Sequence, residues 1–403
     1  GAEDPGGGMT AYIEHLKPFL RKTPFHPRIE ALMHGNSWMR WTGHYSPANF
    51  ESVQSEYFTI RNGASVYDIS PLIKYTIRGR EAAAYVNHLI TRDLSKIKPM
   101  QAFYTSWCQD DGMLVEEGTI FRLGENDFLL NAAKDQLHWL EQTAYGFDVE
   151  IAEASNDLCG LSLQGPESRH VLRAMGLNGI DNLKRFGIQE LELNGHWLRI
   201  DRAGFTGDLG YEIWCKPESA LWLWDRMFDA GRDHKIAPIG AQALEISRIE
   251  AGFLLVDVDY TSALHALRPS NRMSPYELGI GWTVNLNKPG YFVGKRALKK
   301  EKEQGLSRHV LIGIEIEGRK PAPGSFLYAD QPGKVELGLT TSATWSSTLK
   351  KNIAYARVPQ AYAKPGTEMW IEIWYGKEHK IERSMVRCWA ANRMFYDPPR
   401  KSA

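Results

Sequence analysis

A chain of 403 residues is too long for one ordinary hydrophobic core, so two or three packed units are expected. Acidic and basic residues balance at 48 each, and no long block of one sign indicates a nucleic-acid partner. No apolar run is long enough to cross a membrane, and four scattered cysteines without metal-ligand spacing indicate reduced core residues of a cytoplasmic protein that holds no metal.

The first part of the chain predicts a helical start followed by mixed elements. Residues 1–8 resemble an appended tag and are set aside. A short helix is expected at the start of 11–50, followed by an irregular stretch rich in aromatic residues, His and Pro. Residues 51–61 have helical spacing and end at Asn62-Gly63, which is typical of a left-handed cap. The next segments predict strands over 64–70 and 74–79 and a helix over 81–90.

The next part of the chain predicts a hairpin, followed by alternating strands and helices. Strands are expected over 103–107 and 119–123 around an Asp111-Gly112 turn, with another strand over 128–131. Strands and helices then alternate through Gly281 with hairpin-type turns, which indicates an α+β fold rather than a doubly wound parallel sheet.

After residue 300 the helical periodicity fades, and short apolar strands alternate with Pro/Gly turns. This pattern is typical of a small β-sandwich or β-barrel. We therefore expect two interleaved α+β subdomains over 9–300 and a C-terminal β-domain over 301–403.

The segment 201–214 is the most informative stretch, because a glycine recurs in it at every third residue. Such spacing indicates tight turns where side chains would obstruct the chain. Directly afterwards residues 211–215 begin a strand of aromatic and β-branched type with one carboxylate, Glu212. A carboxylate at a rigid strand end can accept two parallel N–H bonds from a flat heterocycle such as a pterin or guanine. The plain alternative is a hairpin with a solvated Glu.

A set of short motifs runs in order along nearly the whole chain: Glu51 to Ser70, Leu163–Pro166, Arg202–Ile213, Arg248–Gly252, Leu278–Trp282, Phe292–Leu298, Gly338–Ser342, Asn352–Ala354 and Pro365–Thr367. Each motif is weak alone, but the ordered set resembles the aminomethyltransferase family, which contains the glycine-cleavage T-proteins. The resemblance implies a three-domain fold around a central opening that binds tetrahydrofolate.

The resemblance also implies roles for particular residues. Glu212 matches the carboxylate that holds the amino-pyrimidine edge of the pterin, and Arg248 matches an arginine that lines the folate site. The other folate-lining positions that it implies are Tyr104, Asn131, Phe205 (where T-proteins usually carry Tyr) and Tyr211.

The sequence departs from T-proteins at the turn that carries their catalytic Asp. T-proteins have Gly-Gly-x-x-Asp-Asp, whereas this chain has Gly112-Met-Leu-Val-Glu116-Glu117, so Glu116 takes the catalytic position. The extra methylene matters, because an error of about 1 Å can cost about 10²-fold in rate. Dimethylsulfoniopropionate demethylase, a relative that moves a methyl group to tetrahydrofolate, resembles this turn and also lacks the Asp. The plain alternative is that both glutamates are exposed turn residues.

These departures favour a demethylase that moves methyl from a small S-, N- or O-methylated metabolite to tetrahydrofolate. The alternative is an orthodox T-protein, which takes an aminomethyl group from a lipoyl carrier protein and gives 5,10-methylenetetrahydrofolate. An O-methyl donor would need a proton from Glu116, Glu117 or a tyrosine. A cationic methyl donor would favour an aromatic cage, for which the candidate walls are Trp38, Trp41, Tyr45, Trp107 and Tyr211.

A non-enzymatic alternative is the folate-binding iron–sulfur assembly factor of the same superfamily, whose signature resembles K-G-C-Y-x-G-Q-E. The matching stretch here, Lys288 to Lys295, has no cysteine, which argues against that function. The same stretch has one residue too few between its glycines for a phosphate-binding loop.

Overall fold

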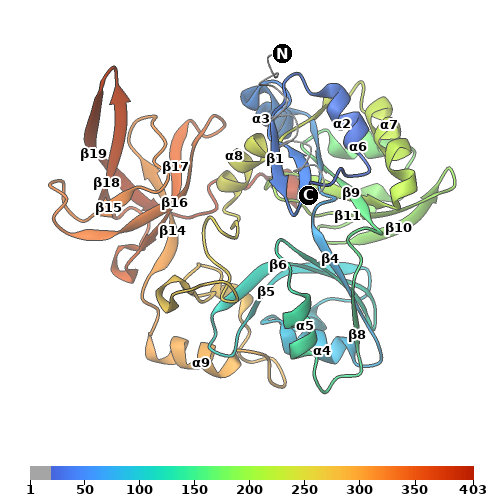
Figure 1. Ribbon diagram of the computed structural model, residues 1–403, viewed down its shortest axis with the longest axis horizontal. Coiled ribbons are helices and arrows are strands. Elements are labelled where there is room, and N and C mark those ends of the chain that lie inside the picture. The colour runs from blue at the N-terminus through green and yellow to red at the C-terminus, as the bar shows by residue number, and fades with distance from the viewer. Residues whose placement is uncertain (1–19) are drawn as a thin grey trace, which may run out of the picture.

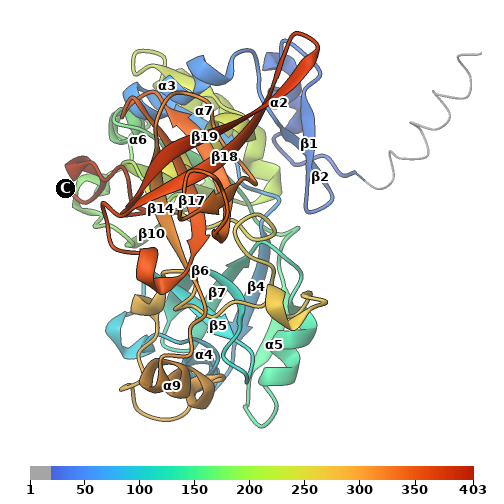
Figure 2. The ribbon, with the colours of Figure 1, turned by 90° about the vertical axis from the view of Figure 1, so that its left-hand side faces the viewer.

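The computed structural model describes residues 20–403, which form three packed units around a central region. In Figure 1 a six-stranded sheet lies at the upper right, a five-stranded sheet lies below it, and a β-barrel lies at the left. Figure 2 shows the barrel facing the viewer, with the five-stranded sheet below it. The predicted α+β fold with a C-terminal barrel is therefore confirmed. The helix expected at the start of 11–50 falls outside the described residues.

The six-stranded sheet is mixed, because five of its strands pair antiparallel and the last pairs parallel with its neighbour. In spatial order it contains β10 (Ile188–Leu193), β11 (His196–Asp201), β12 (Gly210–Cys215), β9 (Cys159–Gln164), β3 (Ala64–Asp68) and β13 (Ile236–Pro238).

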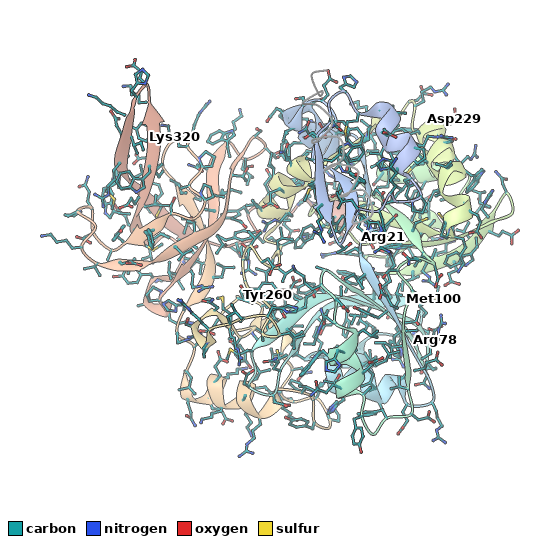
Figure 3. All side chains as sticks on the ribbon, viewed as in Figure 1. Arg21, Arg78, Met100, Asp229, Tyr260 and Lys320 are labelled. Carbon is teal, nitrogen blue, oxygen red and sulfur yellow. The ribbon has the colours of Figure 1, made fainter. Side chains whose placement is uncertain are left out.

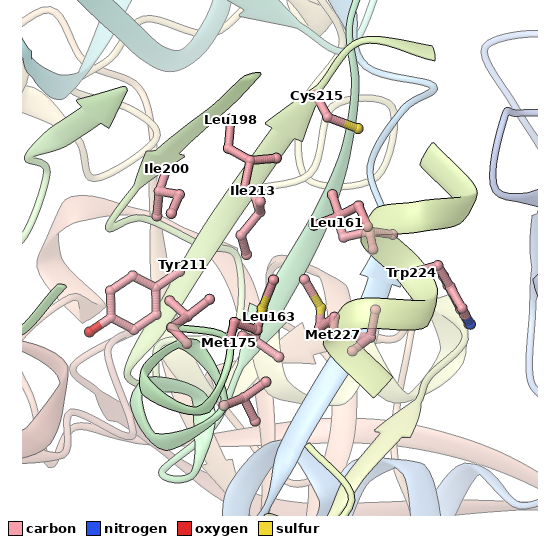
Figure 4. Close-up of a cluster of buried hydrophobic side chains, with 14 of the residues drawn as sticks. Leu161, Leu163, Met175, Leu198, Ile200, Tyr211, Ile213, Cys215, Trp224 and Met227 are labelled. Carbon is pink, nitrogen blue, oxygen red and sulfur yellow. The ribbon is translucent and has the colours of Figure 1, made fainter. Parts of the chain in front are cut away.

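Helices cover both faces of this sheet. One face packs its apolar side chains, including Leu161, Leu198 and Ile213, against α2 (His26–Leu32), α6 (Ser168–Ala174) and α7 (Ala220–Ala230), as Figure 4 shows in part. The opposite face packs against α3 (Val53–Asn62), α8 (Ala241–Ala251) and residues of the five-stranded sheet. The central strands of the sheet are therefore buried on both sides and carry apolar residues on both faces, whereas the edge strand β10 is partly exposed.

The five-stranded sheet is antiparallel throughout and is covered on its outer face by two helices. In spatial order its strands are β5 (Gln101–Cys108), β6 (Leu114–Gly124), β7 (Asp127–Ala132), β4 (Ile73–Arg78) and β8 (Glu150–Glu153), and the helices are α4 (Ala82–Leu89) and α5 (Leu137–Thr143).

The C-terminal unit is a closed six-stranded barrel with its own apolar interior. The helix α9 (Lys295–Gln304) precedes it, and the hairpin of β1 (Trp38–Trp41) and β2 (His44–Pro47) lies near the start of the described chain, in a stretch expected to be irregular. Around the barrel the strands are β14 (Val310–Ile316), β17 (Lys351–Val358), β16 (Glu336–Ser346), β15 (Phe326–Tyr328), β18 (Glu368–Lys377) and β19 (Lys380–Ala391).

The ends of α3 show how sequence sets the element boundaries. Ser52 caps the start, since its hydroxyl accepts a hydrogen bond from the Ser55 N–H at 3.3 Å. Gly63 ends the helix with φ −135°, so the expected left-handed cap is wrong. Glycine is needed there for a different reason: a Cβ would lie 2.6 Å from the Lys235 carbonyl oxygen, where β13 joins the sheet.

A buried ionic cluster joins α3, α8, the glycine-rich turn and the barrel. Arg61 pairs with Glu250 at 2.7 Å and with Asp208 at 3.3 Å. The Glu250 carboxylate also accepts hydrogen bonds from Tyr57 Oη at 2.6 Å and from Ser346 Oγ of the barrel. Buried charges that are paired and hydrogen-bonded in this way fix the relative placement of the elements that carry them.

Candidate functional site

A cavity of about 1430 Å³ lies where the two sheets and the barrel meet. Its volume exceeds the usual range of about 300–1,000 Å³ for small-molecule sites, so it can hold a long ligand. The six-stranded sheet contributes Glu212 to its lining, the five-stranded sheet contributes Glu117, and the barrel contributes Ile312. Tyr260, labelled in Figure 3, lies near the centre of the molecule and contacts Glu117 from the connecting segment.

A row of polar side chains crosses the six-stranded sheet on the face toward this cavity. Asp201, Glu212, Ser162 and Tyr67 are consecutive cross-strand partners on β11, β12, β9 and β3. Directly paired residues share one face of a sheet, so these four side chains project together. Glu212, Ser162 and Tyr67 line the cavity, and Trp41 stacks on the Tyr67 ring with centroids 5.8 Å apart.

Glu212 therefore lies on the cavity wall, as the sequence predicted, with an aromatic surface beside it. Burial raises the pKa of its carboxyl, and a hydrogen bond with Asp201 opposes that rise. Glu212 is partly buried, and a carboxylate in such a place with few protein donors is a strong acceptor for the N–H groups of a flat ligand.

The glycine-rich turn before β12 encloses the side chain of Gln164. A Cβ at Gly204 or Gly210 would lie 2.2 Å or 1.8 Å from Gln164 Oε1, so both positions require glycine by close approach. The Gln164 amide donates to the Ala203 carbonyl at 3.1 Å and accepts from Thr206 Oγ1 at 3.1 Å. The turn that positions Glu212 is therefore held from inside by one amide side chain.

Tyr211 does not reach the cavity, where its predicted role in folate binding would place it. It is the neighbour of Glu212 in β12, and successive strand residues point to opposite faces. Its ring is 0% exposed and packs in the apolar cluster of Figure 4, where its hydroxyl accepts from Arg169 Nε at 3.0 Å.

The two glutamates of β6 also alternate. Glu116 is the cross-strand partner of Trp107 and is 2% exposed. One of its oxygens accepts from the Ala133 N–H at 2.6 Å, and the other accepts from Gln136 Nε2. Burial raises the pKa of Glu116 to about 7. Although Glu116 borders the cavity, protein donors already occupy both of its oxygens.

Glu117 projects from the other face of β6 into the cavity. Its Oε1 accepts from Tyr260 Oη at 3.2 Å, and Tyr104 also hydrogen-bonds to its carboxyl. Burial raises the pKa of Glu117 to about 8, and the nearby Glu116 adds to the rise. A carboxyl with a pKa near neutrality can either give or take a proton. The plain alternative, that both glutamates are exposed turn residues, does not hold, since both side chains border the cavity.

Three other predicted residues line the cavity. Tyr104 stacks on Trp282 with ring centroids 5.7 Å apart, and Phe205 stacks on Phe253 at 5.6 Å. The Asn131 Oδ1 is buried and accepts no hydrogen bond from the residues that the structure describes. An orphaned acceptor at a cavity wall is suited to a ligand donor.

Arg248 borders the cavity but is committed to the protein. It is 0% exposed, and it pairs with Asp259 at 2.8 Å and with Glu245 at 2.9 Å. Its remaining N–H groups donate to Ser342 Oγ at 2.8 Å, to the Phe253 carbonyl at 3.1 Å and again to Glu245. Since a guanidinium has five N–H donors, none is left for a ligand, and the residue serves the fold.

The five candidate walls of an aromatic cage do not come together. Only Trp41 lines the cavity, whereas Trp107 is 0% exposed and Trp38 stacks on His26. Other rings form most of the aromatic lining, namely Tyr67, Phe103, Tyr104, Phe121, Phe186, Phe205, Phe253 and Trp282.

Over residues 20–403 no group of three or more His, Cys, Asp or Glu is placed to hold a metal ion. In the same range, none of the helices is both long and apolar enough to span a membrane. All four cysteines are buried and carry free thiols.

Sequence reasoning did not single out Asp201, Tyr260 and Trp282, and it named Glu116 rather than Glu117 as the catalytic candidate. A signal existed for Asp201, which shares strand parity with Arg199 at the end of β11. Tyr260 and Trp282 lie in the segment between α8 and α9, whose sequence has no helix or strand periodicity from which their position at the cavity could be predicted.

Comparison with known proteins identifies the family. Residues 26–288 match the GCVT N-terminal domain, and residues 309–388 match the glycine cleavage T-protein C-terminal barrel domain. An aminomethyltransferase of Geobacillus sp. (strain WCH70) is 32% identical over 360 residues, covering 88% of this chain and 94% of the relative. One from Clostridium botulinum (strain Okra / Type B1) is 30% identical over 390 residues, covering 95% and 99%.

A solved structure, the glycine cleavage system aminomethyltransferase T from Bartonella henselae, shares the fold. Its TM-score is 0.80 at 23% identity, with 94% of this chain and 98% of that chain covered. The two domain matches and the full-length relatives together place the chain in the glycine cleavage T-protein (aminomethyltransferase) family.

Proposed function

We propose that this chain transfers a one-carbon unit to tetrahydrofolate bound in the central cavity. The observation that carries the proposal is the Glu212 carboxylate on the cavity wall, in the polar row with Ser162 and Tyr67. The amino-pyrimidine edge of a pterin offers two parallel N–H donors to such a carboxylate. The orphaned Asn131 Oδ1 supplies another acceptor, and the cavity volume accommodates a ligand of folate length. The residues present therefore fit the ligand.

The transferred unit that we propose is aminomethyl, with a lipoyl carrier protein as the donor. This replaces methyl transfer as the leading interpretation, because relatives that align over most of their length are named aminomethyltransferases. A second reason is that the proposed cage for a cationic methyl donor does not assemble. Methyl transfer from a small donor is the other outcome of the assay below.

Tetrahydrofolate, when bound, supplies the amine nitrogens that accept the carbon. Glu117 is the residue of this chain placed to hold or move a proton beside them, because its carboxyl faces the cavity with a pKa raised to about 8 by burial. Tyr260 and Tyr104 fix the orientation of that carboxyl. Glu116 would keep β6 and the segment at Ala133 in place.

The assay incubates the protein with tetrahydrofolate and aminomethylated lipoyl carrier protein, and separately with a panel of S-, N- and O-methyl compounds. Methylenetetrahydrofolate and ammonia from the first mixture support the proposal. 5-Methyltetrahydrofolate from the second, with no product from the first, would replace aminomethyl by methyl. No product from either would contradict the proposed transfer.

Substitutions test the two acidic residues. Glu212→Ala should weaken 5-methyltetrahydrofolate binding by about 1–3 kcal/mol, because it leaves ligand donors unpaired. Glu192→Ala, an exposed carboxylate on the same sheet, is the matched control and should bind like the parent. Glu117→Gln should preserve binding and lower kcat by about 10²–10⁴. If Glu116→Gln lowers kcat more than Glu117→Gln does, Glu116 rather than Glu117 is the acid–base group.

A further inference from the structure

Two carboxyl groups lie side by side where Glu212 meets the edge of the cavity. Asp201 and Glu212 are direct cross-strand partners on the antiparallel pair of β11 and β12. Their side chains therefore share one face of the sheet, and like charges in such a pair repel each other. Asp201 is 0% exposed, so water does not screen the repulsion.

The contacts of Asp201 leave one of its oxygens without a donor. Trp214 Nε1 donates to Asp201 Oδ2 at 3.0 Å. The Oδ1 is buried and accepts no hydrogen bond from any other described residue. An ionised carboxylate in this position would lack most of the hydrogen bonds that offset its burial, whereas a protonated oxygen would have Glu212 as its acceptor.

No cation among the described residues pairs with either carboxyl. Arg199 on β11 and Tyr67 on β3 share the sheet face of the pair, and Lys74 on β4 lies near Trp214. Arg199 donates to Glu190 at 2.9 Å, and Tyr67 bonds to a serine hydroxyl. The Lys74 ammonium lies 5.6 Å from the Trp214 ring and donates to backbone carbonyls. The negative charge of the pair is therefore best reduced by a proton.

We propose that Asp201 and Glu212 share one proton, with Asp201 as the acid and Glu212 as the carboxylate, so that Asp201 positions Glu212 for the N–H edge of the ligand. Burial and the charge of Glu212 both raise the pKa of Asp201 well above its ordinary value, which agrees with this assignment. The proton itself does not depend on the ligand, whereas the positioning role rests on the function proposed above.

The pair has two consequences for binding. While it holds one proton, the Asp201 hydroxyl donates to Glu212 and leaves the other lone pairs of Glu212 for the ligand. When alkaline pH removes the last proton, repulsion separates the two carboxylates and folate binding weakens. Asp201→Asn imitates the acid at every pH, because its amide can donate to Glu212 while its carbonyl accepts from Trp214.

The first experiment needs no folate. At pH 7 the infrared spectrum of the free protein should contain protonated-carboxyl absorption to which Glu116 and Glu117 also contribute. The parent-minus-Asp201→Asn difference should show one protonated carboxyl, and the difference for Glu192→Gln, the exposed control on the same sheet, should show none. If the Asn variant does not fold, a ¹³C titration of labelled aspartate in the parent replaces it and should show the assigned Asp201 resonance, distinguished from that of the buried Asp68, to be protonated at pH 7. An absent Asp201→Asn difference, or an ionised Asp201 at pH 7, would overturn the proposal.

The second experiment measures 5-methyltetrahydrofolate affinity by calorimetry from pH 6 to 10. The parent should lose affinity at alkaline pH, Asp201→Asn should keep it, and Asp201→Ala should bind more than about tenfold more weakly at pH 7, the loss expected for one charge-assisted hydrogen bond. If Asn loses affinity as Ala does, the positioning role is wrong. If the parent does not bind folate but the protonated band is present, the proposed function fails and the shared proton stands.

Discussion

Replacing Arg248 with Met should destabilise the protein rather than weaken its ligand binding. Arg248 and Asp259 are both buried, with side chains 0% exposed, and their pair joins α8 to the segment before the barrel at 2.8 Å. Without the guanidinium, the Asp259 carboxylate keeps hydrogen bonds from Thr341 and Ser342 at 2.6 Å and 2.7 Å but loses its cation. Removing one partner of such a pair costs about 3–5 kcal/mol, because the other charge stays buried.

Urea unfolding followed by tryptophan fluorescence measures this loss. The matched control is Arg78→Met, which breaks an exposed pair with Asp127 and should cost less than about 1 kcal/mol. An Arg248→Met variant with the stability of the parent and a lost affinity for 5-methyltetrahydrofolate would refute the reasoning. That result would restore the ligand-binding role that the sequence predicts for this residue.

Three further outcomes are expected. Gly210→Ala should cost about 1–3 kcal/mol in thermal unfolding, because its Cβ would overlap the Gln164 amide. Tyr260→Phe should raise the pH midpoint of kcat, since the lost hydrogen bond lowers the pKa of Glu117 in the parent. The folded chain holds the Glu117 proton up to about pH 8, whereas the unfolded chain releases it near 4.5. This contribution to stability is complete below pH 4.5 and is lost as the pH rises through 8, and Glu117→Gln should flatten that slope in urea titrations.

The sequence located the strand that carries Glu212 and the turn before it, because glycine spacing and β-branched residues are local signals. It did not decide which residues of a strand face the cavity. Of the neighbours Tyr211 and Glu212, only Glu212 lines the cavity. Glu116 and Glu117 both border it, but protein donors occupy both oxygens of Glu116. Both faces of these sheets are buried, so hydropathy does not distinguish them, and the answer depends on which layer covers each face.

The role of Arg248 was also beyond local reasoning. A motif places an arginine near a ligand site, but its five donors are taken by residues 3 to 94 positions away in the chain. Only the packing of α8 against the barrel brings Ser342 and Asp259 to the guanidinium. Long-range partners of this kind decide whether a charged side chain is available to a ligand.

The placement of β3 constrains the order in which the protein can fold. β3 ends at Asp68, but its sheet neighbours β9 and β13 come later in the sequence than every strand of the five-stranded sheet. That sheet is contiguous from Ile73 to Glu153, and its first and last strands pair with each other, so it can close without the rest. During synthesis the five-stranded sheet should therefore form first, and until β9 is made both edges of β3 stay unpaired. We expect the pairing of β3 with β9 to be slow, because the two strands are far apart in the chain. Truncations before Cys159 should leave a folded sheet attached to an aggregation-prone segment.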